Sequence, residues 1–130
     1  MEARPRLRRG PGLRAQLSGA RGEELAESYL RGLGYLILGR NFRVRFGEID
    51  LIARDRQTTV FVEVKRRDST THGQPEDSVA PAKIRRVIAA ARVYAARNKL
   101  SDRPIRFDVI AIHATDSHEE IRHHKGAFAT

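Results

Sequence analysis

The sequence predicts a mixed α/β domain whose elements follow the order αβββαβ. Two segments space their apolar residues by three and four, as a helix does, and β-branched and aromatic runs lie between and after them. A chain of 130 residues is long enough to bury one mixed core without disulfides or a structural metal. We therefore expect a central sheet with helices packed on it.

The first predicted helix covers residues 22–33. Its apolar residues Ala26, Tyr29, Leu30 and Leu33 recur at helical spacing before a glycine. We expect residues 1–18 to form a flexible basic arm and residues 19–130 to form a single domain. Residues 1–22 hold six arginines and one glutamate, so they supply +5 of the net charge of +9. The arm is either a solvated tail or a segment that contacts nucleic acid.

Three β-rich runs follow at residues 35–44, 48–54 and 59–67. The polar stretch 68–79 reads as a loop, and Pro81 then suits the first turn of a second helix that reaches about residue 99. A strand at 105–112 comes next. A short last strand at 120–124 would complete the sheet.

The composition excludes several classes of chemistry. The chain has no cysteine, which removes disulfides, thiol nucleophiles and cysteine-based metal sites. Its 25 Lys and Arg residues outnumber 16 Asp and Glu residues, which favours a polyanionic partner, nucleic acid first. No apolar run is long enough for a membrane helix or a secretory signal, so we expect a cytoplasmic protein that contacts no membrane. The histidines lack a zinc spacing, and we expect His123 and His124 to lie at the surface.

The second and third strands can be paired as a hairpin in which partner numbers sum to 113, leaving residues 55–58 as a four-residue loop. This register makes one face wholly apolar, and a slip of one residue would mix the two faces. The apolar face pairs Ile49 with Val64, Leu51 with Val62 and Ala53 with Val60. The other face pairs Glu48 with Lys65, Asp50 with Glu63 and Ile52 with Phe61.

Asp50 and Glu63 would then face each other at about 5 Å between Cβ atoms, where like charges are destabilising. A divalent cation, Mg²⁺ or Mn²⁺, would compensate, held by the two carboxylates, a backbone carbonyl assigned to Val64, and waters. Lys65 lies two residues further on the same face and would orient a water or stabilise charge on a reacting phosphate. The alternative is a solvated strand face on which Lys65 neutralises Glu48.

Other charged residues extend this site. Glu23 lies in line with the buried stripe of the first helix, so it is predicted to approach the two carboxylates. It is equally well explained as a first-turn acid favoured by the helix dipole. Five basic residues are predicted to hold phosphates around the metal, although each alone suits a solvated surface: Arg40, Arg43, Arg67, Lys83 and Arg86.

An ordered series of motifs resembles the YraN family of bacterial endonuclease-like proteins over residues 19–128. The series comprises Gly19-x-x-Gly22-Glu23-x-x-Ala26-x-x-Tyr29-Leu30-x-x-x-Gly34-Tyr35, Arg40-Asn41-x-Arg43, Gly47-Glu48-Ile49-Asp50-Leu51-Ile52-Ala53, Val60-Phe61-Val62-Glu63-Val64-Lys65-x-Arg67, Val79-x-x-x-Lys83-x-x-Arg86 and Arg106-Phe107-Asp108-Val109. That family is similar to the PD-(D/E)XK nuclease superfamily and to archaeal Holliday-junction resolvases.

The resemblance implies a restriction-endonuclease-like sheet, with Asp50, Glu63 and Lys65 as the catalytic core and Glu23 as an acid carried by a helix. Ile49, not proline, precedes Asp50, which is common in that superfamily. The expected function is a nuclease that uses Mg²⁺ or Mn²⁺ to hydrolyse DNA, with branched or structured DNA as the substrate. The alternative is a catalytically silent module that binds nucleic acid, and the sequence leaves open a homodimer. A purely structural or regulatory protein would leave the Asp50 and Glu63 pair without a purpose.

Overall fold

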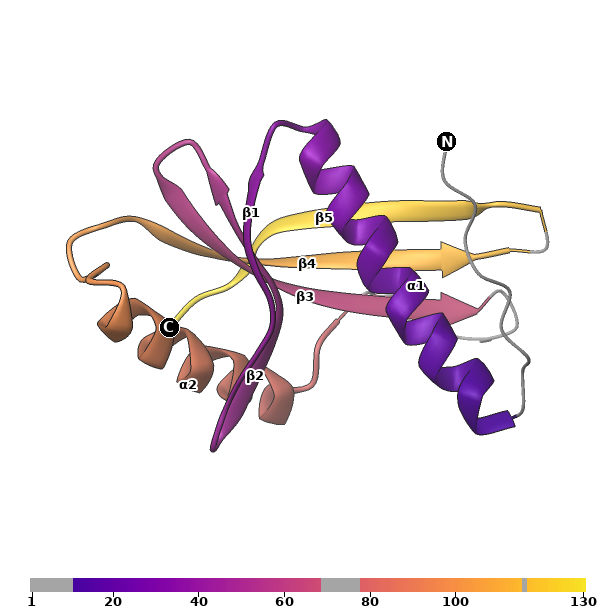
Figure 1. Cartoon of the computed structure of the whole chain (residues 1–130), viewed down its shortest axis with the longest axis horizontal. Coiled ribbons are helices and arrows are strands. Elements are labelled where there is room, and N and C mark those ends of the chain that lie inside the picture. Colours follow the sequence, from indigo (N-terminus) through magenta and orange to yellow (C-terminus); the bar gives the residue numbers. More distant parts are fainter. Residues whose placement is uncertain (1–10, 69–77, 116) are drawn as a thin grey trace.

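The computed structural model describes residues 11–68, 78–115 and 117–130, and it describes the side chains of residues 21–67, 78–115 and 117–130. It contains two helices and five strands within these ranges (Figure 1): α1 Pro11–Gly32, β1 Leu36–Val44, β2 Gly47–Asp55, β3 Thr58–Asp68, α2 Pro81–Arg97, β4 Ile105–Ala114 and β5 Glu119–Phe128. The predicted α/β class and the order of the elements are confirmed. No helix in the described ranges is long and apolar enough to cross a membrane.

The five strands form one mixed sheet in the order β1-β2-β3-β4-β5. β1, β2 and β3 pair antiparallel as a meander, β4 lies parallel to β3 through the α2 crossover, and β5 closes the sheet antiparallel to β4. This arrangement is consistent with a restriction-endonuclease-like fold. In Figure 1, β1 and β2 run steeply across the direction of β3, β4 and β5.

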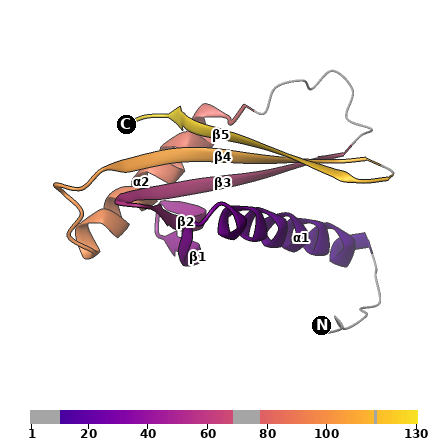
Figure 2. The same cartoon turned by 90° about the horizontal axis from the view of Figure 1, so that it is seen from above.

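The two faces of the sheet carry separate apolar clusters because successive strand residues point to opposite sides. Val60 and Val62 of β3 pack with Ala26 and Leu30 of α1. Phe61, which lies between those two valines, packs instead with the residues that α2 buries, including Val87. The sheet is therefore a layer between α1 and α2, and Figure 2 shows α1 lying along one face of it.

The boundaries differ most from the predicted ones at three places. α1 begins at Pro11, not at residue 22, because residues 11–18 have no apolar periodicity that would reveal a helix; residues 1–10 of the predicted arm lie outside the described residues. β5 has ten residues, twice the predicted length. The hairpin turn between β2 and β3 contains only two residues, since Asp55 still pairs with Thr58 and Arg56 takes the left-handed φ of 58°. Most of the predicted loop 68–79 lies outside the described residues.

Candidate active site

The site is built where β2 separates from β3. Their ladder follows the predicted register from Asp55 opposite Thr58 to Leu51 opposite Val62. At the next step, the Val64 N–H donates to the Asp50 side chain, with 2.9 Å between N and Oδ2. The Asp50 carboxylate thus takes the place that the Ile49 carbonyl would have in a continued ladder. We call this opening the fork.

The predicted pairs beyond the ladder are therefore wrong as backbone pairs. Ile49 does not join the face of Leu51 and Ala53 but packs beside Phe61 in the cluster under α2. The physical reason is the separation of β2 from β3 at Asp50, which breaks the strict alternation of faces on which the prediction rested. The expected apolar alignment of Ile49 with Val64 is lost by the same movement.

Glu63 lies at the centre of the fork and is only 9% exposed. Its Oε1 atom is buried without a hydrogen-bond partner among the described residues, and its Oε2 atom is 3.8 Å from Lys83 Nζ. Burial first, and then the nearby Asp50 carboxylate, raise the pKa of Glu63 to about 8, although the Lys83 charge opposes both. The structure therefore brings the two predicted carboxylates together in a site that favours a proton or a cation.

Glu48 forms ion pairs with three basic residues of the site. Its carboxylate lies 3.1 Å from Lys83 Nζ, 3.5 Å from Arg86 and 3.6 Å from Arg43. The hydrogen bond from Lys83 is the main cause of a lowered pKa of Glu48. Glu48 was expected to face Lys65 across the hairpin, and this expectation is wrong because Glu48 lies beyond the fork and reaches α2 instead.

Glu23 approaches the same site from α1. Its pKa is raised by partial burial and by the Asp50 charge, while a hydrogen bond from the Asn41 side chain lowers it. Asn41 has a left-handed φ of 50°, a conformation that asparagine tolerates better than most residues. The sequence analysis gave Asn41 no role, although an asparagine inside a β-rich run was a usable signal.

Lys65 and Lys83 lie at the edge of the fork on two different elements. Lys65 lies on β3 and donates a hydrogen bond to the Ser78 carbonyl, just before α2. Lys83, which was expected to hold phosphates, also contacts Glu63. The two ammonium groups thus belong to one rim formed by β3 and the start of α2.

The remaining predicted phosphate contacts divide into two kinds. Arg43 and Arg86 lie at the fork because both pair with Glu48. Arg40 is held by Glu27 of α1, with two nitrogen to oxygen distances of 2.6 Å. Arg67 lies near the end of β3 and is half-buried. Only the first two therefore stand beside the carboxylates through described contacts.

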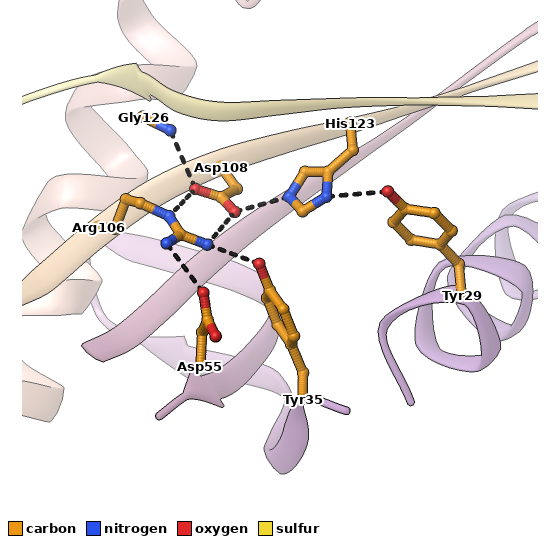
Figure 3. Close-up of polar contacts among 7 residues, drawn as sticks. All are labelled: Tyr29, Tyr35, Asp55, Arg106, Asp108, His123 and Gly126. Atoms are coloured by element: carbon orange, nitrogen blue, oxygen red, sulfur yellow. Dashed lines mark hydrogen bonds and ion pairs between the residues drawn. The ribbon is translucent and has the colours of Figure 1, made fainter. Parts of the chain in front are cut away.

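A buried polar network that the sequence analysis missed holds the other face of the sheet (Figure 3). Asp108 is fully buried and accepts hydrogen bonds from Arg106 at 2.8 and 3.0 Å and from the Gly126 N–H at 3.1 Å. Its Oδ2 also lies 2.7 Å from His123 Nε2. Burial opposes ionisation of Asp108, but these hydrogen bonds outweigh it and hold the pKa at about 2.

This network ties distant parts of the chain together. The second nitrogen of His123 lies 3.1 Å from the Tyr29 hydroxyl of α1, and Arg106 also contacts Tyr35 and Asp55 at 2.8 and 3.2 Å. The expectation that His123 lies at the surface is wrong, since its side chain is 4% exposed, whereas His124 is exposed as expected. The signal for this network in the sequence was Asp108, a charged residue at an inward-facing position of an apolar strand, because a buried carboxylate needs partners.

The fork offers few protein ligands to a metal. In the described ranges, no three His, Asp or Glu side chains gather closely enough to hold a metal ion. A cation would therefore rest on Asp50, Glu63, backbone oxygen and water. Such a small set of protein ligands is sufficient for Mg²⁺, because this ion commonly keeps several waters and binds one or two carboxylates. The unpartnered Oε1 of Glu63 is the observation that fits such an ion.

Fold and fork together define a restriction-endonuclease-like domain with paired carboxylates. Residues 22–112 match the model of the uncharacterised protein family UPF0102. The chain belongs to this family, also called the YraN family. Similar UPF0102 proteins include that of Persephonella marina, 45% identical over 112 residues that cover 86% of this chain and 93% of that protein. That of Geotalea uraniireducens is 49% identical over 111 residues, covering 85% and 87%.

Proposed function

We propose that the fork is the catalytic centre of a metal-dependent phosphodiesterase that hydrolyses nucleic acid, with branched or structured DNA as its substrate. The observation that carries the proposal is the buried Oε1 of Glu63, which has no hydrogen-bond partner among the described residues and lies beside the Asp50 carboxylate. Two adjacent carboxyl groups in this state need a shared proton or a cation, and a divalent ion is the second of these. Family membership supports the fold of the proposed enzyme.

Asp50, Glu63 and the Val64 carbonyl would hold the ion. The Val64 N–H points to Asp50, and because the N–H and carbonyl of one strand residue project to the same side, the carbonyl faces the fork as well. Bound Mg²⁺ or Mn²⁺ would polarise the phosphate and lower the pKa of an attacking water.

The basic rim would position the substrate. Arg43 and Arg86 stand beside Glu48 at the fork, where they would contact phosphates on either side of the reacting one. Lys65, on the same face of β3 as Glu63, would orient the attacking water or balance the charge that develops on the phosphate. Glu23, oriented by Asn41, would complete the acidic side of the site.

A second candidate function is nucleic-acid binding without catalysis. The observation that favours it is the position of Lys83, whose ammonium group lies 3.8 Å from Glu63 and supplies an internal positive charge. If this charge satisfies the carboxylates, the fork needs no metal. The two candidates therefore differ in whether the acids are required for metal binding and for cleavage.

The deciding experiment titrates Mg²⁺ and Mn²⁺ into the protein by calorimetry and assays cleavage of linear, flapped and four-way DNA. We expect Asp50→Asn and Glu63→Gln to lose metal binding and cleavage while keeping DNA binding. Lys65→Ala should keep metal binding and lose cleavage. Glu24→Gln changes an exposed acid of α1 next to Glu23; it is the control for the two carboxylate variants and should change neither metal binding nor cleavage.

Equal metal affinity in the wild type and in Asp50→Asn would show that the fork does not bind the ion. Salt-sensitive DNA binding with no cleavage of any substrate, in the presence of either metal, would favour the binding module. Lys83→Ala should raise metal affinity if the ion and the ammonium group compete for Glu63.

A further inference from the structure

A second positively charged site lies at the opposite end of the hairpin from the fork. A half-open pocket of about 620 Å³ is lined by the β2–β3 turn, the last turn of α2 and the segment that leads into β4. This volume lies within the usual range for small-molecule sites. None of the residues that form the fork lines this pocket.

The charge of the pocket has one sign. Arg54, Arg56, Lys99 and Arg103 line it, and its lining includes no aspartate or glutamate. None of these four residues forms an ion pair within the part of the chain that the structure describes. Four exposed cations that line one concavity without a carboxylate repel one another, and an anion would relieve that repulsion.

Lys99 occupies a position that normally belongs to glycine. The Leu100 N–H bonds to the Ala95 carbonyl at 2.9 Å and the Lys99 N–H to the Ala96 carbonyl at 3.4 Å, which is a Schellman ending of α2. The residue in the left-handed conformation of this motif is Lys99, with a φ of 55°. Glycine would adopt it with less strain, so a lysine at this position costs stability.

Arg56 repeats this feature on the other side of the pocket. It belongs to the two-residue turn between β2 and β3 and has a left-handed φ of 58°. Asparagine or glycine is the usual choice at such a turn. Two cationic side chains thus line the same pocket from strained backbone positions, on elements far apart in the sequence.

We propose that this pocket binds the phosphate group of a nucleotide. The four cations would hold the phosphate, and Tyr94 and Leu38, which also line the pocket, would provide an apolar surface for the base. The nucleotide is either a free mononucleotide or the phosphorylated end of a strand, since both present the same chemistry. This site goes beyond the proposed phosphodiesterase activity and does not depend on it.

The two sites stand apart along α2. Lys83 belongs to the fork, whereas Asn98 lines the pocket just after the end of the helix. At 1.5 Å per residue, Lys83 lies about 16 Å from Tyr94 and about 22 Å from Asn98 along the helix axis. A ligand of mononucleotide size therefore cannot contact both sites, and their binding can be measured separately.

The test measures binding of adenosine 5′-monophosphate by calorimetry at low salt in EDTA, with adenosine as the probe that lacks phosphate. The double variant Arg56→Gly, Lys99→Gly should bind adenosine monophosphate at least about tenfold more weakly. Its melting temperature should be unchanged or higher because glycine relieves both strained positions. Arg92→Ala, which removes an exposed cation of α2 outside the pocket, should leave binding within about twofold.

A second arm compares DNA oligonucleotides with and without a 5′-phosphate. If a 5′-phosphate tightens oligonucleotide binding, the double variant removes this gain and adenosine monophosphate does not bind, the ligand is a strand end; if adenosine monophosphate binds and the double variant weakens it, the ligand is a free nucleotide. The proposal is overturned if adenosine binds as tightly as its monophosphate, or if the double variant binds every probe as the wild type does. Asp50→Asn should leave this binding unchanged, so a failure of the fork cannot be mistaken for a failure of the pocket.

Discussion

Gly47, the first residue of β2, lies directly against the backbone carbonyl of Arg86 in α2, with no room for a Cβ atom between them. The neighbouring Glu48 then reaches Lys83 and Arg86 on the same helix. This close approach positions α2 against the part of β2 that leaves the ladder. Gly47 therefore sets the distance between the acidic and basic sides of the fork.

Gly47→Ala should destabilise the protein by about 1–3 kcal/mol, because the added methyl group meets helix backbone that cannot rotate away. The same change should weaken the contact between Glu48 and Lys83. Urea unfolding measures the first effect. Gly39→Ala is the matched control, since a Cβ atom at Gly39 would meet nothing within 4 Å. Equal stability of both variants would show that α2 does not press on Gly47.

The sequence was sufficient to predict the hairpin register up to Leu51 and Val62, because alternating apolar residues bury one face only when they are paired in this way. It was not sufficient beyond that point. The Asp50 side chain bonds to the Val64 backbone in place of the Ile49 carbonyl, and apolar patterning carries no information about such a substitution. The prediction consequently placed Ile49 on the wrong face.

The Asp108 network shows a different limit. Arg106, Asp108 and His123 come from neighbouring strands, but Tyr29 and Tyr35 reach them only after α1 packs on the sheet. Each contact depends on tertiary geometry, which local spacing does not contain. Likewise, the position of Lys83 beside Glu63 depends on how α2 docks, so the sequence could assign it only to a basic rim.

Glu63→Gln should change how stability depends on pH. The pKa of Glu63 is raised from 4.5 to about 8 in the folded protein, so the folded state binds one more proton than the unfolded state between these values. The free energy of unfolding of the wild type should therefore fall as pH rises from 4.5 to 8. The variant lacks this fall and should be more stable at pH 9 by on the order of 1–3 kcal/mol.

Urea unfolding in EDTA at pH 5, 7 and 9 measures this difference. At pH 5 wild type and Glu63→Gln should agree closely, because the wild-type carboxyl is protonated. Glu24→Gln should show no such pH-dependent gain. A constant difference across the three pH values would mean that Glu63 is charged in the folded protein throughout.

Asp108→Asn should destabilise the protein by about 3–5 kcal/mol, since it removes the charge that balances Arg106 in a buried network. The pKa of Asp108 is lowered to about 2 in the folded state, so its contribution is complete above its ordinary value of 3.8 and is lost as pH falls toward 2. The difference in melting temperature between wild type and variant should thus narrow between pH 4 and pH 2. Asp102→Asn, at an exposed position, serves as control and should leave the melting temperature unchanged.

Metal binding at the fork should release a proton. At pH 7 the raised pKa leaves Glu63 protonated in the metal-free protein, and a carboxyl must lose its proton to hold Mg²⁺. Apparent affinity should therefore rise about tenfold per pH unit from pH 6 toward 8 and level off above it. Calorimetric titrations in two buffers that differ in ionisation enthalpy measure this release. The difference between the two observed heats should correspond to close to one proton released per bound ion. If wild type binds Mg²⁺ with the same heat in both buffers, the ion does not bind through Glu63.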